Sequence, residues 1–178
     1  MAEEIEVPTE HLQEAIQERL EEEGSRWIML VAMAAAMLSV LAAIAALFAG
    51  HHANEATLSQ IKAANSWNYY QAKGVKSYVL SMKIALEKDL NKPIDPSDLK
   101  KLESLSDEQA GIKKEATSLE NESQLHLLRH VPLSAAVTFF QIAIALCAIT
   151  VLTKKFPLFY GSLLLGIIGL LFLLKGLI

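Results

Sequence analysis

The chain has 178 residues, enough for about one domain, of which 52% are hydrophobic and 20% charged. The apolar residues are concentrated at positions 27–50 and 131–178, whereas positions 1–26 and 51–130 are polar. This uneven distribution excludes an ordinary globular enzyme built around one large core. The formal net charge of −4 argues against nucleic acid as a partner, because such binding depends mostly on neutralising phosphates.

The N-terminal segment, residues 1–26, is strongly acidic, with nine glutamates and two arginines. Hydrophobic side chains recur in it at helical spacing, at Leu12, Ile16 and Leu20. This pattern predicts a short amphipathic helix over residues 9–23, with Thr9 as its N-cap. Because acidic faces are repelled by anionic lipid headgroups, we expect this helix to face solvent or to dock on a protein partner.

Residues 27–50 contain no charged side chain and predict a first transmembrane helix. As a helix they would extend about 36 Å, more than the roughly 30 Å of a bilayer's hydrocarbon core. Small residues recur at four-residue spacing, which allows a second helix to approach closely. The candidate oligomer-interface residues of this span are Ala35, Ser39, Ala42, Ala43, Ala46 and Gly50. A simple abundance of alanine in membrane spans is the alternative explanation of the same spacing.

Residues 131–153 and 156–174 predict a second and a third transmembrane helix, joined by a short turn at Lys154-Lys155. Pro132 fits the first turn of the second of these helices, where its missing N–H costs nothing. Positive charge in short segments favours the cytoplasmic side of a membrane. The basic residues of the short segments therefore predict that the N-terminus and the Lys154-Lys155 turn are cytoplasmic.

Residues 51–130 predict an extramembrane antiparallel helical hairpin, interrupted by Pro93 and Pro96 near residues 91–98. A heptad pattern runs through both arms. In the outgoing arm the expected seam residues are Leu58, Ile61, Asn65, Asn68, Ala72, Val75, Val79, Met82 and Leu86. In the returning arm they are Leu102, Leu105, Gln109, Ile112, Ala116, Leu119, Ser123 and His126. The predicted fold class is an all-α membrane protein, with three transmembrane helices and this hairpin between the first and the second.

Polar residues on these seams make two helices alone a weak pairing, so we expect further copies of the chain to complete the core as a homo-oligomer. Trp67, Tyr70 and Gly74 fall on one face of the outgoing arm, where the glycine permits close approach of another helix. We expect this face to pack between subunits. A ligand or partner site is the alternative.

The sequence contains no recognisable catalytic motif, and we expect neither enzymatic activity nor an obligatory cofactor. Two groups of histidine and carboxylate side chains nevertheless flank the apolar segments, and an antiparallel hairpin would bring them to the same level. These residues are His51, His52 and Glu55, and Glu122, His126 and His130. Such side chains bind transition metals, and histidine titrates near neutral pH. The alternative is that they only mark the ends of the membrane spans.

Four stretches, residues 4–12, 49–56, 67–73 and 140–145, resemble a bacterial three-span membrane family known as domain of unknown function 4337. The resemblance covers nearly the whole chain. It implies three spans, a helical middle segment and a bacterial membrane, and we expect this to be the inner membrane. It implies no particular activity.

The function we expect is structural: a membrane-anchored helical hairpin that self-associates into a scaffold or stalk. The first alternative is a metal- or pH-responsive oligomeric channel or sensor that uses the juxtamembrane histidines. The second is an accessory subunit of a larger membrane complex, docked through residues 9–23.

Overall fold

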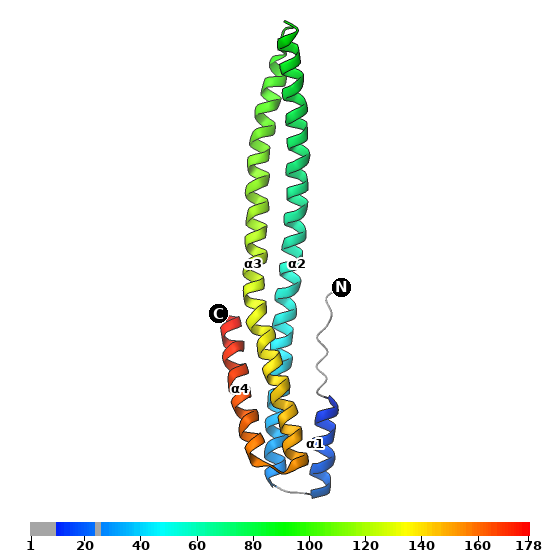
Figure 1. The fold of residues 1–178 in the computed structure, drawn as a ribbon, viewed down its shortest axis with the longest axis vertical. Helices are drawn as coiled ribbons and strands as arrows, with labels where there is room; N and C mark the ends of the chain where they lie inside the picture. Colours follow the sequence, from blue (N-terminus) through cyan, green and yellow to red (C-terminus); the bar gives the residue numbers. More distant parts are fainter. Residues whose placement is uncertain (1–9, 24–25) are drawn as a thin grey trace. The chain divides into compact units, whose positions relative to one another are not determined.

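The computed structural model describes residues 10–23 and 26–178, and within these ranges it contains four α-helices and no strand (Figure 1). The helices are α1 (Glu10–Glu23), α2 (Arg26–Asp89), α3 (Pro96–Thr153) and α4 (Phe156–Leu177). The all-helical part of the predicted fold class is confirmed. Three helices, α2, α3 and α4, are long and apolar enough to cross a membrane. Thr9, the predicted cap of α1, lies outside the described residues.

The break between α2 and α3 follows from local chemistry. Asn91 adopts a left-handed backbone conformation, with φ of 51°, which asparagine tolerates better than most residues. The carboxylate of Asp95 accepts a hydrogen bond of 2.8 Å from the backbone N–H of Ser97 and caps the start of α3. This bond also lowers the pKa of Asp95. Pro96 occupies the first turn, where its missing N–H is tolerated.

Pro132 does not begin a helix, contrary to the sequence prediction. It lies inside α3, which continues from Pro96 to Thr153. A proline inside a helix removes one backbone hydrogen bond. The helical segments on either side of Pro132 are long enough to keep α3 helical despite this loss.

The chain divides into two compact units, Met1–Asn54 with His126–Ile178, and Glu55–Leu125. In the first unit, buried residues of α2 and α3 form one hydrophobic cluster. The α2 side of this cluster is built mostly from small residues, among them Ala35, Ala42, Ala45 and Ala49. Larger side chains of α3 fill the space opposite them, namely Leu133, Val137, Phe140 and Ile144.

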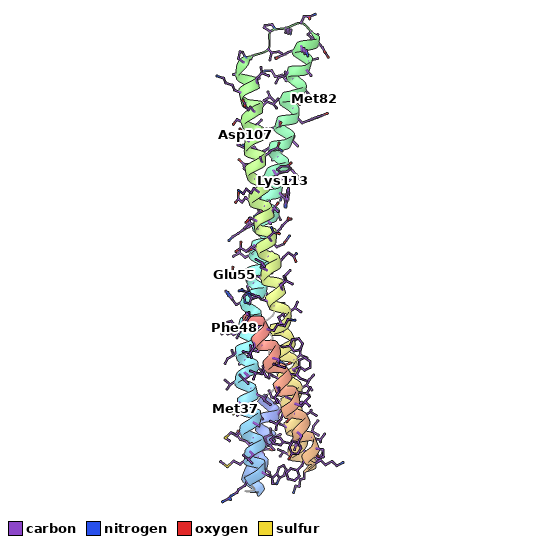
Figure 2. The ribbon with its side chains drawn as sticks, turned by 90° about the vertical axis from the view of Figure 1, so that its left-hand side faces the viewer. Met37, Phe48, Glu55, Met82, Asp107 and Lys113 are labelled. Carbon is purple, nitrogen blue, oxygen red and sulfur yellow. The ribbon has the colours of Figure 1, made fainter. Side chains whose placement is uncertain are left out.

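Helices α1 and α4 also contribute to the core of the first unit. Ile16 of α1 is buried in the hydrophobic cluster, and the Gln13 side chain donates a hydrogen bond to the Ser39 hydroxyl of α2. Helix α4 contributes a face of small residues, with Ser162, Gly166, Gly169 and Gly176 all buried. Its opposite faces expose large apolar side chains, as does α2 at Met37 and Phe48 (Figure 2).

In the second unit, hydrogen bonds join α2 and α3 in antiparallel order. The Ser123 hydroxyl donates to the Ala56 carbonyl at 2.8 Å, in the interior of the unit. Further along α2, the Gln109 amide donates to the Tyr70 carbonyl at 3.2 Å. Near the turn, the Lys83 ammonium contacts the Asp98 carboxylate at 2.6 Å. Residue numbers therefore rise on one helix as they fall on the other.

Candidate functional sites

Two histidines of the first unit, one on α2 and one on α3, are in direct contact. The Nδ1 atoms of His52 and His126 lie 2.9 Å apart. A hydrogen bond between two ring nitrogens requires one to carry a proton and the other to present a lone pair. The pair can therefore be neutral or carry one extra proton, but two imidazolium rings cannot keep this contact.

The surroundings of His52 favour its neutral form. Burial lowers its pKa first, because desolvation disfavours the charged ring. The positive potential of His126, His51, Arg129 and His130 lowers the pKa further. Protonation of both rings would break the contact between His52 on α2 and His126 on α3.

The other two histidines of the predicted metal site, His130 and His51, are placed differently. His130 has its Nδ1 atom 2.9 Å from the Ala49 carbonyl oxygen, so this nitrogen donates a hydrogen bond to the backbone of α2. Ser134 lies 3.2 Å from the opposite nitrogen of the same ring. His51 is exposed, and its ring centroid lies 5.4 Å from that of His52.

The predicted metal site of six residues is not assembled. In the ranges 10–23 and 26–178, no group of three or more histidine, cysteine, aspartate or glutamate side chains is placed to hold a metal ion. The reason lies in the partners already made: His52 and His126 bind each other, and His130 binds a backbone carbonyl. A structural metal site needs about four lone pairs directed at one point. Glu55 and Glu122 belong to the second unit.

The small residues predicted as an oligomer interface lie largely within the chain's own core. Ala35 and Ala42 are buried, and Ala46 is partly buried against the same cluster. Ser39 is hydrogen-bonded to Gln13. Of the remaining two, Gly50 is half-buried and Ala43 exposed. The close approach that these residues permit is thus used between α2 and its neighbours in the same chain.

The aromatic cluster predicted at a subunit interface also packs within the chain. The Trp67 indole N–H donates a hydrogen bond of 2.8 Å to the Glu120 carboxylate of α3. The Tyr70 ring meets the Trp67 ring edge-on, with centroids 5.5 Å apart. A Cβ atom added at Gly74 would lie 2.8 Å from the Gln109 amide nitrogen. This face of α2 is therefore covered by α3.

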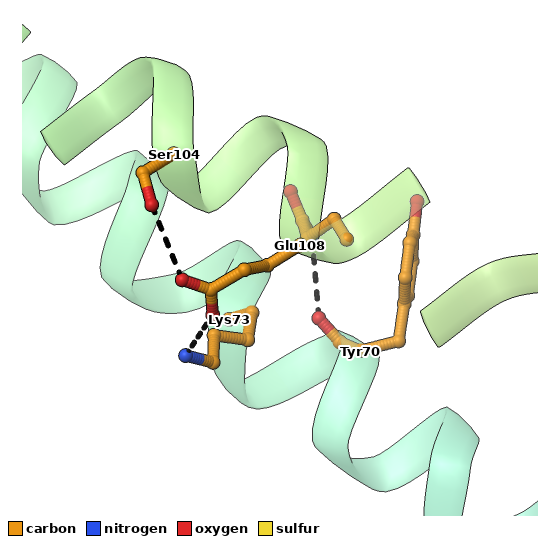
Figure 3. Close-up of polar contacts among 5 residues, drawn as sticks. Tyr70, Lys73, Ser104 and Glu108 are labelled. Atoms are coloured by element: carbon orange, nitrogen blue, oxygen red, sulfur yellow. Dashed lines mark hydrogen bonds and ion pairs between the residues drawn. The ribbon is translucent and has the colours of Figure 1, made fainter. Parts of the chain in front are cut away.

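A polar network that the sequence did not reveal lies next to this cluster (Figure 3). The Lys73 ammonium pairs with the Glu108 carboxylate, which also accepts a hydrogen bond of 3.3 Å from the Ser104 hydroxyl. The pairing raises the pKa of Lys73 and lowers that of Glu108. Both side chains lie at the edge of the α2–α3 contact, where a charged pair stays hydrated and contributes little to stability.

The seam prediction for α2 is wrong, and the error reveals an uncovered surface. In the second unit, α2 turns small residues toward α3, with Ala56, Ser59 and Ala63 buried. The six large apolar residues of the expected seam are instead between 45% and 63% exposed: Leu58, Ile61, Val75, Val79, Met82 and Leu86. Asn65, Asn68 and Ala72 are also exposed. We call these nine residues the outer face of α2; Met82, labelled in Figure 2, marks it.

The prediction for α3 agrees better with the structure. Leu105, Ile112, Ala116 and Ser123 of the expected seam are buried, and Leu102, Gln109 and Leu119 are half-buried. The side of α3 that faces away from α2 is polar between residues 103 and 122. The outer face of α2 therefore has no apolar counterpart on this stretch of α3.

The family model for DUF4337, a domain of unknown function, matches residues 27–178. The chain belongs to the DUF4337 family. The matched range contains all three apolar helices, both histidines of the contact pair and the outer face of α2. Neither curated proteins nor solved structures gave a match.

Proposed function

We propose that this DUF4337 protein is a membrane-anchored helical scaffold, in which the first unit holds the chain in a bilayer and the second unit joins it to other copies. Catalysis has no part in this function. The proposed location is the bacterial inner membrane, with the N-terminus and the Lys154-Lys155 turn on the cytoplasmic side.

The exposed surface of the first unit supports the anchoring role. Large apolar side chains point outward along α2 and α4, including Met37, Leu47, Leu164 and Leu171, each more than half exposed. A soluble protein rarely exposes apolar patches of this extent, whereas lipid accepts them readily. The helical backbone satisfies its own polar groups, as a membrane span requires.

The single observation that carries the self-association role is the outer face of α2. Complete burial of a Val, Leu, Ile or Met side chain contributes about 1.5–3 kcal/mol, so covering the exposed half contributes about 1 kcal/mol. Six such side chains on each of two copies would contribute on the order of 10 kcal/mol. This is comparable to the cost of association from free solution, and anchoring in one membrane reduces that cost.

The mass of the full chain in mild detergent, measured by size exclusion with light scattering, tests this proposal. We expect an oligomer for the wild type and a monomer for the double substitution Val75→Lys with Val79→Lys, which places two charges on the outer face. The matched control adds the same two charges to exposed positions of α3, Ala110→Lys with Asn121→Lys, and should remain oligomeric. A monomeric wild type would refute the proposal.

A second candidate function, a response to pH, is favoured by the contact between His52 and His126. Acidification would place positive charge between α2 and α3, next to His51, His130 and Arg129. The test is the rate of amide hydrogen exchange around residues 49–54. Lowering the pH from 7.5 to 5 should raise this rate more in the wild type than in His52→Gln. Equal exchange in both proteins, after correction for intrinsic rates, would exclude this function.

A further inference from the structure

We infer that the outer face of α2 joins two copies of this chain side by side, parallel and in register, with Asn65 and Asn68 each facing its own counterpart. This inference rests on the proposed self-association and names the surface, the orientation and the residues that set the register.

The spacing of the outer face is the first argument. Its residues occupy positions 58, 61, 65, 68, 72, 75, 79, 82 and 86, which alternate steps of three and four along one uninterrupted helix. These are the first and fourth places of a heptad, the pattern by which two helices pack along a shared seam. Leu58, Ile61 and Asn65 are turned away from α3, since they follow the buried Ala56, Ser59 and Ala63 by two residues, about 200° around the helix. Further along, Val75 and Val79 border a recess that they share with Lys101 and Leu105 of α3, and both remain more than half exposed.

The choice of a second α2 as the occupant follows from the composition of the unit. The outer side of α3 is polar over residues 103–122 and offers no apolar seam. The outer face of another α2 has matching apolar residues at matching spacing. Two such faces can cover each other while each copy keeps its own contact between α2 and α3.

The residues that flank the seam favour a parallel pair. The fifth heptad place holds Lys62, Tyr69, Lys76 and Lys83, of which Lys83 already pairs with Asp98, whereas the seventh holds Ala64, Gln71, Tyr78 and Ala85. In a parallel pair the fifth place of one helix meets the seventh of the other, so lysines meet uncharged side chains. In an antiparallel pair the fifth places meet each other, which sets lysine against lysine. Anchoring both copies in one bilayer with the same orientation also makes the helices parallel.

Asn65 and Asn68 fix the register. In register, each asparagine faces the same residue of the other copy, and the two side-chain amides can donate and accept a hydrogen bond between them. A shift by one heptad would bury the Asn65 amide against Leu58 or Ala72 and the Asn68 amide against Ile61 or Val75, leaving polar groups without partners at a cost in stability. The two asparagines weaken the seam and in return restrict it to one alignment.

Cysteine cross-linking of the full chain in membranes tests the inference. The background is Cys147→Ala, because Cys147 is the only cysteine. Leu58→Cys and Leu86→Cys chains, carrying tags of different mass, are expressed together. A parallel, in-register pair gives only Leu58→Cys homodimers and Leu86→Cys homodimers, since a disulfide needs Cα atoms within about 7 Å. Ser118→Cys, on the exposed side of α3, is the control and should not cross-link.

Each result decides a separate claim when light scattering is run on the same proteins. Mixed Leu58–Leu86 dimers would overturn the parallel orientation, and an oligomer without cross-links on the outer face would overturn the surface while leaving self-association intact. A monomer would refute both proposals. In the variant Asn65→Leu with Asn68→Leu, we expect cross-links between Val79→Cys of one copy and Leu86→Cys of the other, which are one heptad apart, to rise severalfold, or the oligomer to grow. If the mass and the cross-links are unchanged, Asn65 and Asn68 do not set the register.

Discussion

The glycine face of α4 gives a stability prediction whose size can be worked out from the structure. A Cβ atom at Gly169 would lie 2.9 Å from two ring carbons of Phe140 and 3.3 Å from the Cβ of Phe139. Phe140 is fully buried, so its ring can move only by displacing its neighbours in the core. The substitution Gly169→Ala should therefore overpack the contact between α3 and α4.

The expected change in the free energy of unfolding is the difference between two opposing effects. Overpacking a dense core costs about 1–3 kcal/mol. Replacing glycine by alanine inside a helix contributes about 0.5–1 kcal/mol in the opposite direction. The difference between these two effects predicts that the free energy of unfolding falls by roughly 0–2.5 kcal/mol.

The matched control is Gly161→Ala on the same helix. The nearest atom to its added Cβ is a methyl group of Leu146 at 3.9 Å, an ordinary van der Waals contact. This variant should retain the helix-propensity gain and be as stable as the wild type or more stable. The assay is unfolding in mixed detergent micelles of increasing dodecyl sulfate content, followed by circular dichroism. If Gly169→Ala proves as stable as Gly161→Ala, the reasoning about the α3–α4 contact is wrong.

Three further predictions concern polar contacts. Because the pKa of His52 is lowered in the folded chain, the unfolded chain binds more protons on acidification. The free energy of unfolding should therefore fall as the pH drops below about 6.5, and this fall should be less steep in His52→Gln. Ser123→Ala removes the buried hydrogen bond to the Ala56 carbonyl and should cost about 1 kcal/mol in the unfolding of the second unit, whereas Thr117→Ala, at an exposed site, should cost less. Asp95→Ala removes the cap of α3, and amide hydrogen exchange over residues 97–99 should become faster than in Ser106→Ala, an exposed control.

Much of the fold could be predicted because it depends on the length and composition of continuous stretches. The uncharged residues 27–50 and the apolar residues after 131 are long enough to span a bilayer, and three apolar helices are observed there. The break before Pro96 was also predictable, since two prolines within four residues cannot continue a helix. On α3, the buried positions coincide with the most apolar heptad, so hydrophobicity alone identified Leu105 and Ile112.

The face that α2 turns toward α3 could not be predicted from hydrophobicity. Two heptad patterns coexist on α2, and hydrophobicity favours the more apolar one, which is exposed. The buried one has small residues every seven positions: Ala35, Ala42, Ala49, Ala56 and Ala63. Small side chains let the helix backbones approach and admit hydrogen bonds such as Ser123 to Ala56. The regular spacing of alanine was the signal that would have identified this face.

The histidine contact was only partly predictable. Antiparallel helices explain why His52 and His126 meet, but their rotamers and the backbone partner of His130 depend on packing that the sequence does not specify. The same packing leaves fewer than three ligands for a metal ion within the described part of the chain.

The accessibility of the outer face in the purified full chain tests the central claim most directly. With Cys147→Ala as background, the rate at which a hydrophilic maleimide labels Val79→Cys is compared with that of Ser118→Cys as the protein is diluted. If a second copy covers the outer face, Val79→Cys is labelled slowly at high concentration and approaches the control on dilution, because Val79 is 60% exposed in the single chain. Labelling of Val79→Cys as fast as the control at every concentration would contradict the account.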